Sequence, residues 1–330
     1  MMIAKKTIRG FTKSHQFTRV ERKITKVIGA LIKFTFLLGF CFVILKPVIT
    51  MIFNAFMSRA DLADNSVLYI SRNPTLLNFK AAADTLHYGE ALKNTIILTL
   101  STAVIQILSC MMVGYGFARH KFPLKRLLFG FVIFTIIVPP MLFAIPYYRT
   151  FCYFDPFGLA TLVGEDSINL LNTYLPFWML GGSCMGIKNG IYIYMFKQAF
   201  EALPKELEEA GNMDGASSFG IFWKIMVPNI KSVLVTMILF AVVWQYNDAT
   251  FTRILFSSEP TFSLSYGNLA TISDTVKEIV GYSINDVSVS AYYPVLKSTG
   301  AFMMMLPLMI FYAFAQKHFV NSVANAGIVG

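Results

Sequence analysis

Long apolar runs alternate with polar segments along the chain, and this alternation predicts its elements. Runs of span length lie at roughly 29–53, 92–117, 127–147, 174–196, 230–247 and 295–316. About twenty apolar residues are needed to cross the hydrocarbon core of a bilayer as a helix. The pattern therefore predicts an all-α integral membrane protein with six transmembrane helices. A composition that is 55% hydrophobic and only 14% charged excludes an ordinary soluble domain.

The basic residues predict the orientation of these spans. Residues 1–28 carry eight Lys and Arg against the single acid Glu21, and the loop after residue 117 carries four more and no acid. Lys and Arg are enriched on the cytoplasmic side of membrane proteins, so the net charge of +10 is explained without a nucleic-acid partner. We expect both termini in the cytoplasm, as a basic tail (1–28) and a C-terminal tail (318–330). The membrane domain between them, 29–317, includes outer loops at 54–88 and 249–294.

One polar segment, 197–228, differs from an ordinary connector. Glu206, Glu208 and Glu209 follow Pro204, which suits the first turn of a helix with acids near its positive end. Leu203, Leu207, Ala210 and Gly211 give this helix one narrow face of small and apolar residues. Gly215 is placed to end the helix in a left-handed conformation. Ser217 or Ser218 can cap a second helix. In that helix Phe219, Phe222, Trp223 and Met226 form an amphipathic stripe.

The same segment carries a motif. The sequence reads Glu209-Ala210-Gly211, three residues, Gly215, nine residues, and then Ile225-Met226-Val227-Pro228. It resembles the cytoplasmic motif of ATP-binding-cassette (ABC) import permeases, E-A-A, three residues, G, nine residues, I-x-L-P. Gly211 replaces the second alanine and Val227 replaces the leucine. The phrases LPKELEEAGNMDGAS and YGFARHKFP are similar to the sugar-importing branch of that family. An amphipathic surface loop is the alternative reading.

The resemblance implies a fold and a set of partners. It implies the type I importer permease fold in the bacterial cytoplasmic membrane, with many passes through the bilayer. It also implies a second, related permease subunit in a heterodimer, two ATPase subunits that bind ATP and Mg²⁺, and an external solute-binding protein. This chain would form half of the pathway for a sugar or oligosaccharide. In the resembled family the 204–215 helix docks in a cleft of the ATPase, which makes Glu206, Glu209, Ala210, Gly211, Asp214 and Gly215 the candidate coupling residues.

Polar residues inside the spans are candidates for the translocation pathway. Lys188 and Asn189 lie in the fourth predicted span, and Trp244 and Asn247 lie at the end of the fifth. An ionisable residue in a membrane marks a candidate functional site, although Lys188 can also extend along its span to the inner headgroups. Residues 249–294 exceed a bare connector and are expected to face the solute-binding protein or to form a lid.

No residues support catalysis or a metal centre in this chain. There is no phosphate-binding G-x-x-x-x-G-K-[ST] loop, the four histidines are scattered, and the four cysteines are best read as small hydrophobic residues. We therefore expect no enzyme activity and no cofactor of its own. A stand-alone ion-coupled transporter is the alternative from another class. That alternative predicts inverted repeats and intramembrane carboxylates, which the spans do not provide.

Overall fold

The computed structural model describes residues 2–64, 66–67, 69–158, 161, 167–256, 258, 261 and 287–326. The chain divides into two units, residues 1–75 and 76–330, and each is described by itself. Within the described residues, all regular elements are helices, apart from one isolated bridge between Phe154 and Ile168. The expectation of an all-α chain is thus confirmed.

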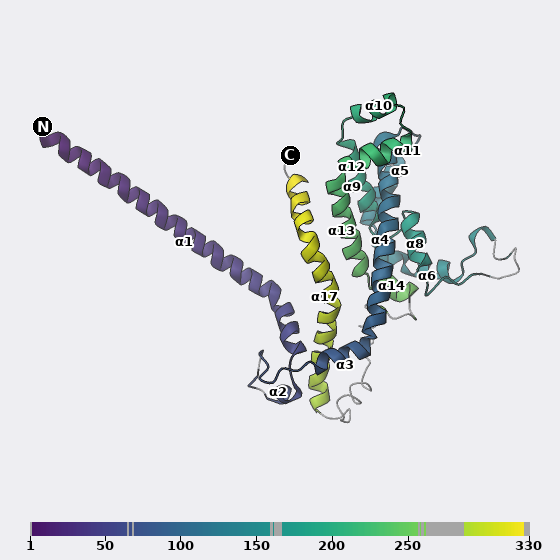
Figure 1. The fold of residues 1–330 in the computed structure, drawn as a ribbon, viewed down its shortest axis with the longest axis horizontal. Coiled ribbons are helices and arrows are strands. Elements are labelled where there is room, and N and C mark those ends of the chain that lie inside the picture. Colours follow the sequence, from purple (N-terminus) through teal and green to yellow (C-terminus); the bar gives the residue numbers. More distant parts are fainter. Residues whose placement is uncertain are drawn as a thin grey trace. The chain divides into compact units, whose positions relative to one another are not determined.

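The first unit consists mainly of one long helix, α1 (Met2–Ala55), shown in purple in Figure 1. Its apolar side chains from Val27 to Leu45 are exposed, as expected of a helix that contacts lipid. The helical backbone continues back through the predicted basic tail. After α1, the short helix α2 (Arg59–Ala63) is capped by the Ser58 side chain, which accepts a hydrogen bond from the Asp61 amide. The outer loop predicted at 54–88 therefore begins with ordered structure.

The second unit is built around α4 (Tyr88–Arg119), which packs against α8 (Leu175–Gly182), α9 (Asn189–Glu201) and α13 (Lys231–Tyr246). The core between them is formed by Ile107, Met111, Tyr192, Phe196 and Met237, among others. At Gly114 the helices approach closely, since an added Cβ would lie 2.7 Å from the Cβ of Phe196. The predicted second and fifth spans are confirmed as continuous helices.

The last helix, α17 (Val287–Ala326), joins this core through two tyrosines. The Tyr246 hydroxyl donates to the Met304 carbonyl at 2.6 Å, and the Tyr88 hydroxyl donates to the Met303 carbonyl at 3.1 Å. At its other end α17 contacts α3 (Leu77–Leu86), where the Tyr292 hydroxyl donates to Asn78 at 2.8 Å. The helix runs on to Ala326, through much of the predicted C-terminal tail.

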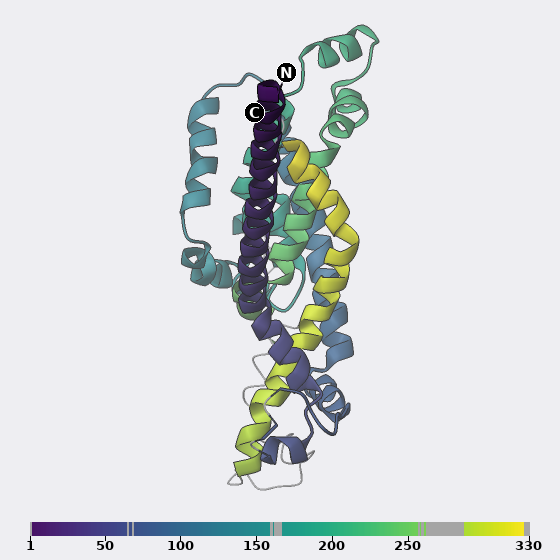
Figure 2. The same ribbon diagram turned by 90° about the vertical axis from the view of Figure 1, so that its left-hand side faces the viewer.

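Prolines bend the third predicted span. The helix α5 (Lys125–Ile137) ends before Pro139, a 3₁₀ turn η1 (Pro140–Phe143) follows, and α6 (Ala144–Cys152) leaves at an angle of 100°. The bend is visible in Figure 2, where α5 stands beside the bundle and the chain turns at its end. Proline removes a backbone donor and clashes with the preceding turn, which explains why the helix stops there.

The fourth predicted span, 174–196, is not one helix, and this expectation is wrong. Helix α8 ends at Gly182 and α9 begins at Asn189, and between them Cys184 and Lys188 adopt the left-handed conformation. The interruption is stabilised from another helix. The Gln106 side-chain amide of α4 donates to the Ile187 carbonyl at 2.6 Å and hydrogen-bonds the Asn189 side chain. Irregular backbone at membrane depth is tolerated where protein groups satisfy it in this way.

Among the described residues, three helices are long and apolar enough to cross a membrane, and two bent pairs bring the number to as many as five. The helices are Thr25–Ala55, Tyr88–Arg119 and Tyr292–Gln316. Within the outer loop predicted at 249–294, the structure describes α14 (Thr250–Leu255) and the start of α17. Most of that loop, including 262–286, lies outside the described residues.

Candidate functional site

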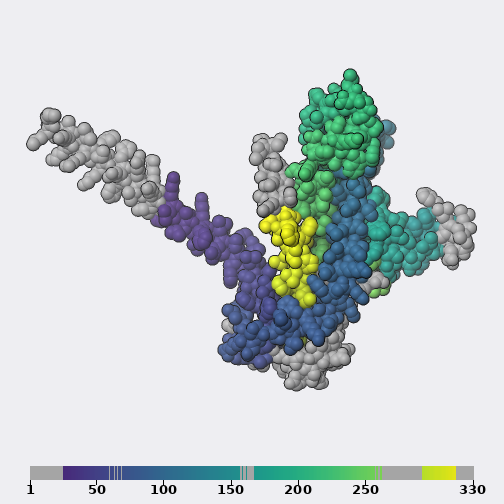
Figure 3. All heavy atoms as spheres, viewed as in Figure 1, coloured from purple at the N-terminus to yellow at the C-terminus, as the bar shows by residue number. Residues whose placement is uncertain are grey.

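The polar segment 197–228 forms a projecting end of the second unit, drawn in green in Figure 3. Its first helix, α10 (Glu206–Met213), carries three acids in its first turn. Glu206 and Glu209 are exposed, as are Ala210 and Asp214. Pro204 precedes the helix by two residues and is not in its first turn, which corrects the predicted start. The acids nevertheless lie where the helix dipole favours negative charge.

Gly215 ends α10 as predicted. Its φ of +75° is left-handed, and the Gly215 amide donates to the Asn212 carbonyl at 3.0 Å. The Ala216 amide donates to the Gly211 carbonyl, also at 3.0 Å. These two bonds form the Schellman arrangement that closes a helix end. Ser217 then caps α11 (Ser218–Ile221) by accepting from the Gly220 amide at 3.1 Å, which identifies the capping serine.

The small face of α10 packs against its own chain. Gly211 is buried, and an added Cβ would lie 2.7 Å from Ile225 Cδ1 and 3.1 Å from Ile221 Cγ1. The sequence predicted a face of small residues here but could not identify its partner, which is the second half of the same loop. Gly211 therefore shapes the loop, whereas Ala210, one residue earlier, faces outward.

The second half of the loop departs from the predicted stripe. After α11 the chain makes a π-helical turn, η3 (Phe222–Met226), and a short helix α12 (Val227–Asn229), and then bends by 84° into α13. Phe222 and Met226 are buried as expected, but Phe219 is 65% exposed and Ile221 is buried in its place. The extra residue in the π turn rotates the helix relative to a regular repeat of 3.6 residues, so the stripe does not continue across it.

Arg119, at the end of α4, joins this loop to the bundle. Its guanidinium Nη2 donates to the carbonyls of Phe200 at 2.7 Å and Leu203 at 2.6 Å. Its Nε lies 3.6 Å from Oε1 of Glu208 on α10. The sequence identified Arg119 only as one positive charge of a cytoplasmic loop. Nothing in the spacing distinguished Glu208, which faces the bundle, from its exposed neighbour Glu209.

The candidate pathway residues are only partly brought together. The Lys188 ammonium lies 5.7 Å from the ring centroid of Trp244, a cation–π arrangement between the α8–α9 break and α13. Asn189 is buried and bonded to Gln106, whereas Asn247 is exposed and donates to the Val243 carbonyl at 2.8 Å. Lys188 and Trp244 thus form a pair, whereas the Asn189 side chain connects the break to α4 and the Asn247 side chain bonds to a carbonyl of α13.

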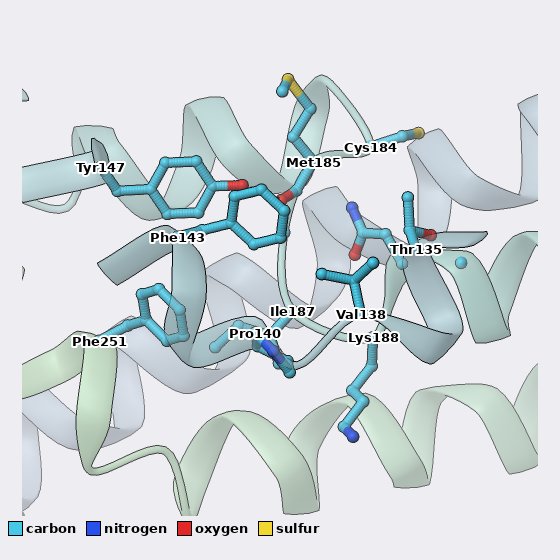
Figure 4. A pocket seen from close by; sticks show the side chains of 13 residues that line it. Thr135, Val138, Pro140, Phe143, Tyr147, Cys184, Met185, Ile187, Lys188 and Phe251 are labelled. Carbon is cyan, nitrogen blue, oxygen red and sulfur yellow. The ribbon is translucent and has the colours of Figure 1, made fainter. Parts of the chain in front are cut away.

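A pocket of about 320 Å³ lies beside the break. It is lined by the break itself, the α5–α6 bend and α14, with contributions from Thr135, Tyr147, Lys188, Asn189 and Phe251. In Figure 4 the Tyr147 hydroxyl points toward Met185, to whose carbonyl it donates at 3.0 Å, and Lys188 extends away from it. Aromatic and aliphatic walls with a few polar groups are typical of small-molecule sites.

A stripe of buried polar residues on α4 was missed by the sequence interpretation. Thr95, Thr99, Thr102 and Gln106 are all more than nine-tenths buried, and Gln245 of α13 is also buried. Their spacings of four, three and four residues place the α4 members on one helix face. That periodicity inside an otherwise apolar span was the signal that could have revealed them. In the described part of the chain, Thr102 Oγ1 and Gln245 Nε2 have no hydrogen-bond partner.

Comparison with known proteins decides the family. Residues 109–325 match the family described as binding-protein-dependent transport system inner membrane component. The chain belongs to this family. The match begins in the last third of α4, extends almost to the end of α17, and includes the coupling segment and the α8–α9 break. The permease is accordingly a multi-pass protein of the bacterial cytoplasmic membrane.

Curated relatives match the permease along nearly its whole length. The maltodextrin transport system permease protein MdxG of Bacillus subtilis is 25% identical over 92% of this chain and 98% of its own. MalD of Streptococcus pneumoniae, with the same description, is 26% identical over 94% and 98%. The crystal structure of a bacterial ABC transporter that imports the acidic polysaccharide alginate contains a chain with a TM-score of 0.64 and 21% identity. That likeness covers 88% of this chain and 96% of the other, and it confirms the fold.

Proposed function

We propose that this permease is the membrane subunit of an ATP-driven importer and forms half of the translocation pathway for a sugar or oligosaccharide. The observation that carries the proposal is the exposed position of α10 and its well-defined end. This acidic helix projects from the bundle with Glu206, Glu209, Ala210 and Asp214 exposed, and a Schellman turn at Gly215 fixes its end. The names of the maltodextrin permeases support the solute class.

The proposal includes a placement in the membrane. The chain crosses six times, with α5–α6 as a bent third span, α8–α9 as a broken fourth span, and both termini in the cytoplasm. The basic residues of the segment 119–126 and α10 then lie on the same side. Figure 1 supports this placement, since α10 lies at the end of the bundle that is opposite α3. The predicted domain limits, 1–28, 29–317 and 318–330, belong to this placement.

The coupling step follows from the geometry of α10. Its exposed face presents carboxylates and the small Ala210 to a cleft in one of the two ATPase subunits, which bind the ATP and Mg²⁺. Gly211 contributes indirectly, because its close contact with Ile221 and Ile225 sets the shape of the loop. Gly215 sets the direction in which the chain leaves the helix. Movement of the ATPase subunits would then move α10 and the helices attached to it.

The pathway lies between this permease and a second, related one, and an external solute-binding protein delivers the solute. Lys188 and Trp244 line the pathway as a cation–π pair, and Asn247 lies three residues beyond Trp244, directly after the end of α13. Asn189 contributes to the wall of the pocket and stabilises the break through Gln106. Aromatic faces beside polar groups suit a sugar, whose rings present both apolar and hydroxyl surfaces.

Reconstitution tests this proposal directly. The permease, its partner permease, the two ATPase subunits and the solute-binding protein are placed in proteoliposomes with maltotriose as the probe. We expect uptake that requires ATP and the binding protein. Uptake driven by a proton or sodium gradient without ATPase subunits would overturn the proposal, and ATP-dependent uptake of a solute that is not a sugar, without uptake of any sugar, would overturn the sugar assignment.

A pair of charge reversals locates the coupling surface. Glu209→Lys and Lys224→Glu each reverse one exposed charge of the same cytoplasmic segment. Glu209→Lys should abolish the stimulation of ATP hydrolysis by loaded binding protein, because it places a cation on the docking face. Lys224→Glu is the matched control and should retain the stimulation. Equal behaviour of the two variants would remove Glu209 from the docking surface.

A further inference from the structure

The guanidinium of Arg119 connects three elements at the end of α4. Arg119 is the last residue of α4, and its Nη2 donates to the carbonyls of Phe200 and Leu203, at and just after the end of α9. The end of a helix exposes carbonyls that have no intrahelical partner, and a cation there is favourable. The third connection is to Glu208 of α10. One side chain thus holds α4, the end of α9 and α10 together.

The connection to α10 is the incomplete one. Arg119 and Glu208 are both shielded from solvent, with side chains 6% and 19% exposed. The Nε–Oε1 distance of 3.6 Å is too long for a hydrogen bond, and in the described part of the chain neither atom has another hydrogen-bond partner. Buried charges stabilise a structure only when their hydrogen bonds are well made. The pair would therefore stabilise the structure more strongly if Nε of Arg119 and Oε1 of Glu208 came closer together.

A small movement is enough to complete the pair. Charge-assisted N–H···O bonds are ~2.8 Å long, so the gap closes with a displacement of under about 1 Å. Tyr115, one turn before Arg119 on α4, also interacts with the Glu208 carboxylate. The Tyr115 ring packs against the rings of Phe200 and Phe222, and these contacts hold it in place beside Glu208. Pressure on α10 toward the bundle would bring Glu208 onto Arg119.

The same inward face of α10 also contacts a different part of the chain, because Gly211 lies three residues after Glu208. Gly211 packs on Ile221 and Ile225, which belong to the segment that leads into α13. Without Arg119, a displacement of α10 would reach α13 through this contact and the continuous chain. It would reach α4 less directly, although α4 is the helix around which the bundle packs.

We propose that Arg119 is a positioning residue through which displacement of the coupling helix α10 is passed to α4 and α9, the Arg119–Glu208 pair closing as α10 is pressed toward the bundle. The inference rests on the proposed function, because it takes the docked ATPase as the source of the displacement. It adds a residue outside the motif segment and assigns opposite roles to two adjacent acids. Glu209 faces the ATPase, and Glu208 faces the bundle.

The experiment measures whether α10 and α4 move together. Spin labels are attached at Met213→Cys on α10, where the side chain is 88% exposed, and at Met112→Cys on α4, where it is 46% exposed. The four native cysteines are replaced by alanine, and the complete importer is assembled in nanodiscs. Distances are measured by pulsed electron paramagnetic resonance without nucleotide and with Mg²⁺, ATP and vanadate. With Arg119 present, we expect the distance to differ between the two states by no more than the displacement of under about 1 Å that closes the pair.

The variants separate a coupling role from a structural one. Arg119→Gln should make the distance depend on nucleotide, Arg119→Lys should restore part of the wild-type behaviour, and Lys125→Gln is the matched control. Lys125 begins α5, six residues after Arg119, and donates to one backbone carbonyl, that of His120. Because Arg119→Gln also weakens the end of α9, Glu208→Gln serves as a second variant that leaves both carbonyl contacts in place. A purely structural role would change the distances equally in both nucleotide states.

The outcomes are distinct from those of the proposed function. The coupling ratio, as maltotriose molecules transported per ATP hydrolysed, should fall about fivefold or more in both Arg119→Gln and Glu208→Gln. A wild-type α10–α4 distance that changes with nucleotide as much as in the variants would overturn this inference alone. So would a distance in Arg119→Gln and Glu208→Gln that stays the same in both states. ATPase subunits that do not assemble with the wild-type permease would overturn the proposed function instead.

Discussion

Replacing Gly114 by alanine should separate the two central helices of the bundle. The new Cβ would lie 2.7 Å from the Cβ of Phe196, 3.1 Å from the Lys197 amide nitrogen and 3.2 Å from the Ile193 carbonyl oxygen. Carbon atoms normally pack at ~3.5–4.0 Å, and these three atoms are close to or part of the α9 backbone, so they cannot rotate away. Helix α9 as a whole must shift.

The expected loss of unfolding free energy follows from a comparison of Gly114→Ala with Gly116→Ala. Gly116 lies on the same helix, and a Cβ there would meet nothing within 4 Å. Both substitutions gain the helix propensity of alanine over glycine, ~1 kcal/mol, so this gain cancels in their difference. Overpacking costs ~1–3 kcal/mol, and we expect Gly114→Ala to be less stable than Gly116→Ala by that amount.

The assay is equilibrium unfolding of the purified permease in mixed micelles, followed by circular dichroism. Because α9 leads into the coupling segment, maltotriose uptake should also fall in Gly114→Ala and be retained in Gly116→Ala. Equal unfolding free energies for the two variants would refute the close packing of α4 on α9.

Three further predictions concern the loop, the break and the outer segment. Gly215→Ala should lower the free energy of unfolding by ~1–2 kcal/mol because alanine resists the left-handed conformation, and it should lower transport activity. Gly215→Asn should recover part of the lost transport activity, and equal transport by both variants would contradict this. Gln106→Leu should lower the unfolding free energy by ~1–3 kcal/mol because it leaves the Ile187 carbonyl unsatisfied, whereas Val104→Ala at an exposed position should change it little. Hydrogen bonds from Ser71 and the Asn73 amide lower the pKa of Asp61 below its usual value. The stabilisation that they contribute is therefore present above the pKa of Asp61 in the unfolded chain, and it is lost as the pH falls through the pKa of Asp61 in the folded chain. Hydrogen exchange across 58–73 should therefore accelerate in acid, and Asp61→Asn should abolish that pH dependence.

The sequence predicted the helices whose apolar runs are bounded by charge. Helix α4 begins and ends within a few residues of the expected span, and α13 matches it closely. The Gly215 turn was also predictable, because a left-handed helix end requires a residue without a Cβ.

The α8–α9 break was not predictable from the segment itself. Residues 183–188 are small or apolar apart from Lys188, so they resemble the span around them. The groups that permit the break, above all the Gln106 amide, lie about eighty positions earlier on α4. Tertiary contacts of this kind leave no trace in a local hydrophobic pattern.

The coupling segment shows the same limit on a smaller scale. Its small face and its acids were apparent in the sequence, but which of them face inward depends on packing. Gly211 contacts Ile221 and Ile225, and Glu208 turns toward Arg119, whereas Ala210 and Glu209 remain exposed. Adjacent residues on a helix point in directions about 100° apart. A motif therefore predicts that the helix is present but not which of its residues face inward.

Cross-linking of α10 to the ATPase tests most directly whether this helix is the coupling element. Cysteines at Ala210 and Asp214, both exposed, are treated with a short bifunctional thiol reagent in the assembled, transport-active importer, with Met185→Cys, 62% exposed beside the pocket, as control. We expect a covalent permease–ATPase species from positions 210 and 214 and none from 185. An active importer that gives no such species from either α10 position would contradict the claim that α10 is the coupling element.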